Sequence, residues 1–198
     1  MKRIEIEELL ENALNECEKL KNLKYEIVIA KNGNETNINL EFPIRCFYHL
    51  LGFQYLVDIN HLHSDTNKER LYLDVLDNKN SLKSKIVESK YILDIVPRLT
   101  AVTKLITILD SNEETYYSKS SYFIKWRRIE YDYAFHFQED DIWYDFYFIK
   151  DNGRDSYSMI SLFSDQKPLN CHANRPHTLI KKTKYFKDTD LTEQLYSK

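Results

Sequence analysis

The chain has 198 residues, of which 42% are hydrophobic and 14% aromatic, and its formal net charge at pH 7 is -3. This composition can form a packed core and excludes a low-complexity protein, while the small net charge excludes a globally basic nucleic-acid coat. No stretch approaches the roughly 18 uninterrupted apolar residues of a membrane span. We therefore expect a cytoplasmic protein without a membrane partner. The three cysteines are scattered and form no C-x-x-C pair, so neither a disulfide framework nor a zinc knuckle is indicated.

The first half of the chain is predicted to be mainly helical. Residues 3–22 carry apolar side chains at three- and four-residue spacing, which is typical of an amphipathic helix. The alternating runs KYEIVIA and TNINLEF are joined by KNGNE, and Asn-Gly in that position predicts a β-hairpin. Further helices are expected over 44–51 and 53–59, over 65–78 with Asp65 or Thr66 as N-cap, and over 81–111, where Pro97 introduces either a kink or a boundary.

The second half is predicted to be a sheet. The runs TYYSKSSYFIKW, RRIEYDYAFHFQ, IWYDFYFIKD and RDSYSMISLFS alternate in the manner of antiparallel strands, and HTLIKKTKYF would add a final strand. The fold class is therefore α+β in a single domain over 1–198. Residues 1–110 are expected to be mainly helical with a hairpin, 111–187 to form an antiparallel sheet of about four to five strands with the helices on one face, and 188–198 to be a polar tail.

Motifs for well-known chemistry are missing from the sequence. It contains no phosphate-binding glycine loop, no G-x-S-x-G and no H-E-x-x-H. His61 and His63 beside Asp65 could bind a metal, but residues two apart do not share a helix face, and a solvated loop is the favoured interpretation. No metal and no other cofactor is therefore expected.

Two basic stretches point to nucleic acid. In SKSSYFIKWRRIEYDY, Lys125, Arg127 and Arg128 are interleaved with Trp126 and other rings. Cations that contact phosphate and rings that stack on bases are what single-stranded nucleic-acid binding requires. The local sequence alone favours a simpler interpretation, in which the aromatic rings belong to the core and the charged side chains are exposed to solvent. The second stretch, NRPHTLIKKTKYFK, contains Lys181 and Lys182, and it would form a positive surface with the first if the two are neighbours in the sheet.

RNA can be cleaved without a metal by a base that takes the 2′-hydroxyl proton, an acid that protonates the leaving 5′-oxygen, and a cation or donor that stabilises the phosphorane. Any one histidine is more often structural than catalytic, and this applies to each histidine separately. The candidates for these roles are His49, Lys125, Arg128, Ser161, His172 and His177.

The segment FYHLLGFQYLVDI, which follows the hairpin and precedes helices and a sheet, resembles the fourth class of the phage-associated Barnase–EndoU–Colicin–RelE-like (PBECR) nucleases, as does the later DSYSMISLF. The resemblance covers about residues 20–185. It implies a metal-independent, ribonuclease-like fold with a curved antiparallel sheet, and an origin in a phage, prophage or other mobile element. It also implies that His49 matches the motif histidine and Ser161 the strand serine.

Three functions are therefore considered. The first is an RNA-cleaving toxin or effector with His49, Ser161 and Arg128 as catalytic residues, and with Lys125, Trp126, Arg127, Lys181 and Lys182 contacting RNA. The alternative is a non-catalytic binding protein on the same fold, such as a phage anti-defence inhibitor that binds a host protein, because tyrosine-rich surfaces suit protein contacts. A third possibility is a protein that sequesters or modifies a small molecule in an aromatic pocket.

Overall fold

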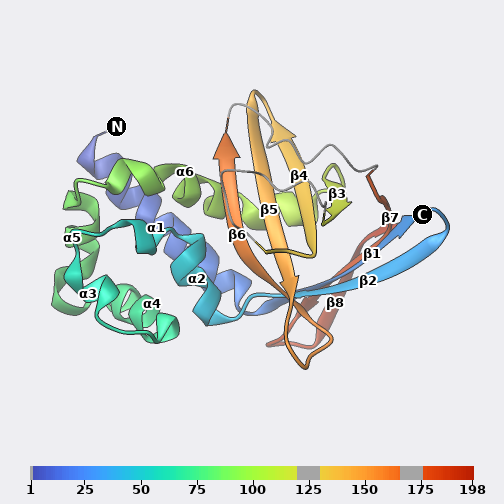
Figure 1. Cartoon of the computed structure of the whole chain (residues 1–198), viewed down its shortest axis with the longest axis horizontal. Helices are drawn as coiled ribbons and strands as arrows, with labels where there is room; N and C mark the ends of the chain where they lie inside the picture. Colours follow the sequence, from blue (N-terminus) through green and yellow to red (C-terminus); the bar gives the residue numbers. More distant parts are fainter. Residues whose placement is uncertain (1, 120–129, 166–175) are drawn as a thin grey trace.

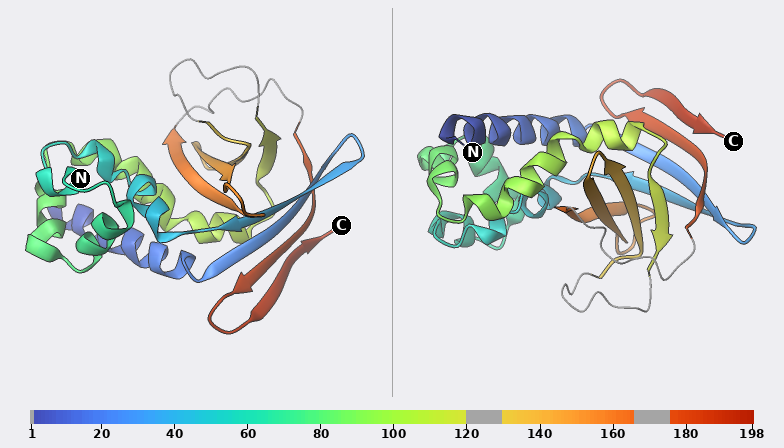
Figure 2. Two further views of the ribbon diagram at one scale, coloured as in Figure 1. Left: turned by 60° about the horizontal axis from the view of Figure 1, so that its bottom comes forward. Right: turned by 90° about the horizontal axis from the view of Figure 1, so that it is seen from above.

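The computed structural model describes residues 2–119, 130–165 and 176–198. It shows an elongated α+β molecule with helices gathered at one end and a sheet at the other (Figure 1). The N-terminus lies at the helical end and the C-terminus at the sheet end (Figure 2). The predicted α+β class is confirmed. None of the helices in these three ranges is both long and apolar enough to cross a membrane.

Helix α1, Arg3–Leu20, is the predicted amphipathic helix. Its buried side chains include Ile6, Leu10, Leu14 and Cys17, which follow the three- and four-residue spacing of one helix face. This face packs mainly against α6. The charged side chains on the outside form short-range pairs such as Arg3–Glu7.

The predicted hairpin is also confirmed. Strands β1, Leu23–Lys31, and β2, Asn34–Glu41, pair antiparallel from Lys24↔Glu41 to Lys31↔Asn34. The turn consists of Asn32 and Gly33, which have φ values of 53° and 80°. Both residue types tolerate positive φ, and this is the reason why Asn-Gly specifies such a turn.

Short helices follow the hairpin. They are α2, Ile44–Leu50, the 3-10 turn η1, Phe53–Tyr55, α3, Asn60–His63, and α4, Lys68–Leu76. The expected helix over 53–59 is only the single turn η1. The N-cap of α4 is Asn67, whose side chain accepts a hydrogen bond from the Arg70 amide, and not Asp65 or Thr66. Asp65 instead accepts from the Asn67 amide, which stabilises the approach to the helix.

The long helical tract is divided into the 3-10 turn η2, Lys79–Ser81, and the helices α5, Leu82–Glu88, α6, Ile92–Thr103, and α7, Leu105–Asp110. Pro97 lies inside α6 and does not mark a helix boundary. The break between α6 and α7 falls at Lys104.

The sheet is larger than predicted. Its further strands are β3, Thr115–Ser118, β4, Tyr133–Glu139, β5, Ile142–Lys150, β6, Tyr157–Asp165, β7, Thr178–Phe186, and β8, Leu191–Ser197. Within the described ranges they form one eight-stranded sheet in the order β3-β4-β5-β6-β2-β1-β7-β8, and not one of four to five strands. The sheet is mixed, because β2 runs parallel to β6 through the pairs Leu40↔Tyr157 and Glu41↔Ser158.

Two features account for the difference. The N-terminal hairpin, which was predicted as part of the mainly helical half, is inserted between β6 and β7. Strand β8 forms where a polar tail was expected, and most of its side chains are exposed. An edge strand needs little apolar alternation when its backbone pairs with a neighbour, so a polar sequence can conceal it.

The sheet curls until its two halves meet. Tyr116 of β3 and His177, just before β7, form an isolated antiparallel bridge. The main core fills the space between the helices and one face of this curled sheet, and it includes Leu109 of α7 and Phe135 and Phe146 of the sheet. The curl, visible in Figure 1, leaves β4, β5 and β6 with a second face. On this face Tyr131, Ala134 and Tyr147 form a separate buried cluster.

Candidate active site

The central strands β4, β5 and β6 present two chemically different faces. On one face, Phe135, Phe146 and Phe148 belong to the main core. Neighbouring residues along a strand point to the opposite face. The strand register arranges these neighbours in two rows, His136–Asp145–Phe163 and Ala134–Tyr147–Ser161, which together we call the second face.

The second face contains a buried acid–base pair. Nδ1 of His136 and a carboxylate oxygen of Asp145 are hydrogen-bonded, and the two residues are only 3% and 0% exposed. The ring of Tyr117 lies edge-on to the imidazole, with the centroids 4.9 Å apart. A carboxylate at Nδ1 fixes the orientation and the tautomer of the ring, so that Nε2 becomes its basic nitrogen. This is the arrangement in which a histidine can transfer a proton in a defined direction.

Aromatic rings surround this pair on the same face. Tyr147 lies edge-on to Tyr131 and to Phe163, with centroid distances of 5.0 and 5.9 Å. Ser161, the serine implied by the family resemblance, is 8% exposed and stands opposite Tyr147 in the register. The structure therefore brings Ser161 onto the same sheet face as His136 and Asp145.

His49 lies at the C-terminal end of α2, and it is exposed at an open pocket of about 440 Å³. Its pKa is lowered by partial desolvation and by the positive charges of Lys68 and Arg98. The imidazole is therefore neutral at pH 7, the state required of a general base. The pocket is lined by Arg45, Cys46, His49, Thr66, Asn67, Lys68, Glu69 and Ile160.

The pocket and the second face adjoin each other. Ile160 of β6 lines the pocket and also packs against the cluster around Tyr147. Two cations stand at the pocket. Arg45 pairs with Asp151 at 3.0 Å, and the Lys68 ammonium lies 4.5 Å from the ring centroid of Tyr48. Cations held in this way can contact a phosphate beside His49.

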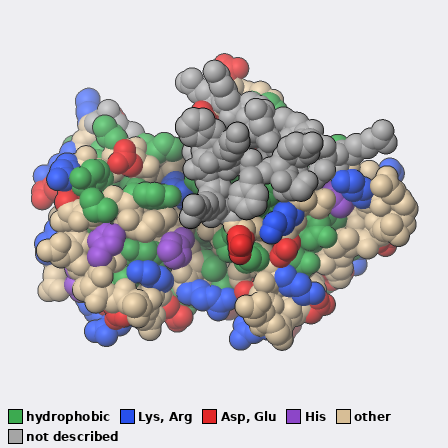
Figure 3. Space-filling view, viewed as in Figure 1, with side chains coloured by type: hydrophobic (Ala, Val, Ile, Leu, Met, Phe, Trp, Pro, Cys, Tyr) green, Lys and Arg blue, Asp and Glu red, His purple; other side chains and the backbone are tan. Residues whose placement is uncertain are grey.

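The predicted RNA-contacting lysines on β7 differ from each other in environment. Lys181 keeps 42% of its side chain exposed, with Glu26 at 3.6 Å. Lys182 is fully buried, where its ammonium pairs with Glu114 and donates to the Leu109 carbonyl at 3.1 Å. In this position Lys182 ties α7 to the sheet and does not face solvent. On the face shown in Figure 3, Lys and Arg side chains are interspersed with Asp and Glu.

Other predicted site residues fall outside the described ranges. They are Lys125, Trp126, Arg127 and Arg128, between residues 119 and 130, and His172, between residues 165 and 176. His177 is described, and its ring lies edge-on to Tyr133 at 6.0 Å.

The histidines considered for a metal site have separate partners. Nε2 of His61 bonds to Asp74 at 3.0 Å, whereas Nε2 of His63 bonds to the Leu56 carbonyl at 3.2 Å. They belong to the one-turn helix α3 and not to a loop. In the part of the chain that the structure describes, no group of three or more His, Cys, Asp or Glu side chains is placed to hold a metal ion.

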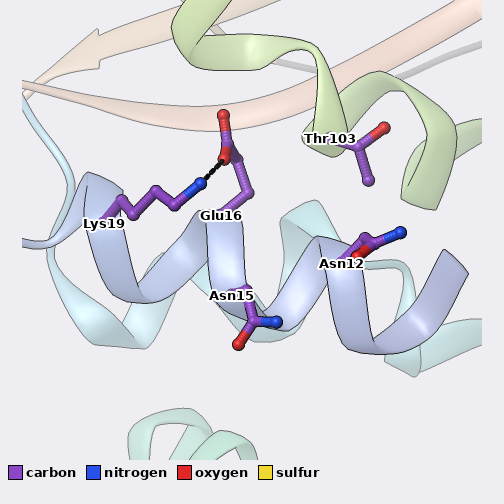
Figure 4. A pocket seen from close by; sticks show the side chains of 5 residues that line it. All are labelled: Asn12, Asn15, Glu16, Lys19 and Thr103. Atoms are coloured by element: carbon purple, nitrogen blue, oxygen red, sulfur yellow. Dashed lines mark hydrogen bonds and ion pairs between the residues drawn. The ribbon is translucent and has the colours of Figure 1, made fainter. Parts of the chain in front are cut away.

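A further open pocket, of about 550 Å³, lies along α1 (Figure 4). It is lined by Asn12, Asn15, Glu16, Lys19 and Thr103, and Glu16 and Lys19 form an ion pair at 3.2 Å across one turn of the helix. The pairing neutralises the two charged side chains among the described residues of this lining. None of the predicted site residues belongs to it.

Sequence analysis missed His136 and Asp145, although a signal was available. Strands β4 and β5 are joined by Asp140 and Asp141, so that Glu139 pairs with Ile142. Three residues further from the turn on each strand, His136 stands opposite Asp145. Both residues also alternate with phenylalanines that enter the core, and this places them together on the opposite face.

The protein thus has an α+β fold with an oriented His–Asp pair on one face of the sheet. An open pocket with a neutral histidine and two cations adjoins that face. These groups can carry out acid–base chemistry on a negatively charged substrate. The family model "phage-Barnase-EndoU-ColicinE5/D-RelE like nuclease 4" (PBECR4) matches residues 9–198, nearly the whole chain. The chain belongs to this nuclease family, which confirms the resemblance drawn from its sequence. No curated protein and no solved structure gives a significant match to it.

Proposed function

We propose that the protein is a metal-independent endoribonuclease, encoded by a phage or another mobile element, that acts as an RNA-cleaving toxin or effector. The observation that carries this proposal is the His136–Asp145 pair on the sheet face that also contains Ser161 and adjoins the His49 pocket. Membership in a nuclease family supports a nucleic-acid substrate. We propose RNA as the nucleic acid, because His49 and His136 can supply the base and the acid that attack by a 2′-hydroxyl requires.

The two histidines suit opposite tasks. Partial desolvation, together with Lys68 and Arg98, favours the neutral form of His49, which can take the proton of the 2′-hydroxyl. His136, whose ring is oriented by the hydrogen bond between Nδ1 and Asp145, can act as the acid that delivers a proton from Nε2 to the leaving 5′-oxygen.

The remaining groups would hold the phosphate. Arg45 and Lys68 at the pocket can contact phosphoryl oxygens, and the Ser161 hydroxyl can donate to one of them. Lys181, Lys125, Trp126 and Arg127 remain predicted RNA contacts, and Arg128 a predicted catalytic cation. Lys182 is left out of this set because its ammonium is buried against Glu114.

The proposal is tested by incubating the protein with total RNA and with a tRNA pool in the presence of a chelator. We expect cleavage by the native protein, and loss of cleavage in folded His136→Ala and His49→Ala variants. His63→Ala is the matched control, because His63 is an exposed histidine whose Nε2 bonds to a backbone carbonyl. Cleavage that persists in both site variants would reject this active site. An inert native protein that forms a stable complex with a host protein would instead support the non-catalytic binding alternative.

A further inference from the structure

We infer that Arg98 is a positioning residue of this site, and that the His-Leu-Leu-Gly turn is shaped around its side chain so that α2, with His49, is held against β6. The inference rests on the proposed ribonuclease function for its link to catalysis. The geometric part can be tested without that function. Arg98 carries no motif signal in the sequence, where it stands in the helical tract IVPRLT.

The shape of the turn is the first observation. Gly52 has a φ of +82°, which favours glycine over residues with a Cβ atom. A Cβ atom at this position would lie 2.8 Å from Cδ of Arg98 and 3.0 Å from Cγ2 of Ile95. The glycine of the turn therefore makes room for the Arg98 side chain on α6.

The contacts of the guanidinium are the second observation. Arg98 is 6% exposed, and on the side of the turn it donates to the His49 carbonyl at 3.4 Å and to the Tyr55 hydroxyl at 3.2 Å. The carbon of its guanidinium also lies 4.6 Å from the ring centroid of Phe163, one of the residues of the second face. A planar group with donors at its edge can stack and donate at the same time, which a lysine cannot.

One side chain therefore connects the turn that carries His49 to the strand that carries Ser161. Nearby, the Ser164 hydroxyl of β6 donates to the Pro97 carbonyl of α6 at 2.9 Å, so this strand and this helix are also joined at the residue before Arg98. Displacement of Arg98 should loosen α2 against β6. A shift of about 1 Å in the position of a catalytic group can cost about 100-fold in rate.

Arg98 also sets the electrostatic environment of His49. The charged side chains around this histidine are Arg45 of α2, Lys68 and Glu69 of α4, and Arg98 of α6. Of these, Lys68 and Arg98 lower its pKa. Removal of Arg98 should therefore raise the pKa of His49. If Arg98 served only to fill space in the core, its removal would leave the pKa of His49 unchanged.

The first experiment is an NMR titration of the His49 ring, assigned by its absence in His49→Gln. We compare the native protein with Arg98→Met, which keeps the apolar stem without the charge, and with Gly52→Ala, which keeps the arginine but crowds it. Both changes should raise the pKa of His49. Arg70→Met is the control, because Arg70 is an exposed arginine that pairs with Asp65, and its loss should leave that pKa unchanged.

The second experiment measures cleavage kinetics. Arg98→Lys keeps the positive charge but not the planar group, so its kcat should fall about tenfold or more while KM stays within about twofold. Unchanged kcat in Arg98→Met and Arg98→Lys would overturn the link to catalysis. If Gly52→Ala does not fold, Arg98→Met decides the titration.

The two proposals fail in distinguishable ways. If the native protein cleaves no RNA, the proposed function fails, and the His49 titrations of Arg98→Met and Gly52→Ala together still decide whether the charge and the placement of Arg98 act on His49. If folded Arg98→Met leaves the pKa of His49 unchanged, the positioning role of Arg98 is overturned even when the native protein cleaves RNA.

Discussion

His136 and Asp145 stand directly opposite each other on the β4–β5 hairpin, and their side chains form a buried, hydrogen-bonded pair. The tight turn at Asp140 and Asp141 sets this pairing, because it determines which residues of the two strands face each other. The pair is buried on a face that also contains a serine and several tyrosines. Its chemistry is the basis of the first prediction.

Asp145→Asn should lower kcat for RNA cleavage by about 100-fold, because the amide keeps the shape of the carboxylate but no longer supports positive charge on His136. Cleavage rates with a chelator present, together with thermal unfolding, provide the measurement. Asp155→Asn is the matched control, since the Asp155 side chain is 86% exposed and pairs with Lys150 at the surface. Equal rates in the native protein and in a folded Asp145→Asn variant would argue against a role of the pair in proton transfer.

Lys68→Met should move the acidic limb of the pH–rate profile to higher pH. In the native protein this limb should lie below the ordinary histidine pKa of 6.5, since partial desolvation and the charges of Lys68 and Arg98 disfavour protonation of His49. Loss of the positive charge makes protonation easier, so the pKa rises. Lys90→Met is the matched control, because the Lys90 ammonium also lies over a tyrosine ring, that of Tyr91 at 5.0 Å. A limb that does not move in Lys68→Met would exclude His49 as the titrating base.

His177 should make the stability of the protein depend on pH. Its two ring nitrogens are buried at the bridge between β3 and β7 and have no hydrogen-bond partner among the residues that the structure describes, and its pKa is lowered by desolvation and by Lys31. The unfolded state therefore takes up the proton first. The contribution of neutral His177 to the free energy of unfolding is therefore fully present above about pH 6.5. It is lost as the pH falls through the lowered pKa that His177 has in the folded state.

The measurement is the drop in unfolding temperature between pH 7.5 and pH 5. His177→Phe should reduce this drop, because phenylalanine can keep the edge-on contact with Tyr133 and does not titrate. His63→Phe serves as the comparison at an exposed position. An equal drop in the native protein and in His177→Phe would show that the bridge does not respond to protonation.

Lys182→Met should destabilise the protein by about 3–5 kcal/mol, because it leaves the carboxylate of Glu114 buried without its cation. Chemical denaturation measures this free energy of unfolding. The double variant Glu114→Gln/Lys182→Met should recover part of the loss, and Lys181→Met, at the partly exposed neighbouring position, should cost much less. A stable Lys182→Met variant with weakened RNA binding would instead favour the RNA-contacting role predicted from the sequence.

Local sequence patterns account for much of the fold. The apolar spacing of α1, the Asn32-Gly33 turn and the alternation of β4, β5 and β6 each depend on neighbours within a few residues, and all three agree with the structure. The parallel pairing of β2 with β6 joins residues more than a hundred positions apart, and no local pattern marks it. Strand β8 was missed for a related reason, since its exposed polar side chains lack the alternation of a half-buried strand.

The residues of the candidate site also fall into those that local sequence identifies and those that only the structure identifies. The His-Leu-Leu-Gly segment identified the family and directed attention to His49, and both inferences needed only adjacent residues. Lys181 and Lys182 are neighbours in the same basic run, yet one is partly exposed and the other fully buried, because alternation along β7 and the position of α7 separate them. A charge pattern read along the chain contains no information about that difference.

The amino-acid sequence alone was sufficient for the α+β class, the hairpin, the amphipathic helix and the nuclease family, because all of these depend on short-range patterns. Tertiary structure was needed to assemble the site. Pairing of β4 with β5 brings His136 to Asp145, the curl of the sheet gives them a separate face, and packing of α6 against the turn at Gly52 places Arg98 between His49 and Phe163. Long-range backbone pairing and close packing produce these contacts, and both depend on the whole chain.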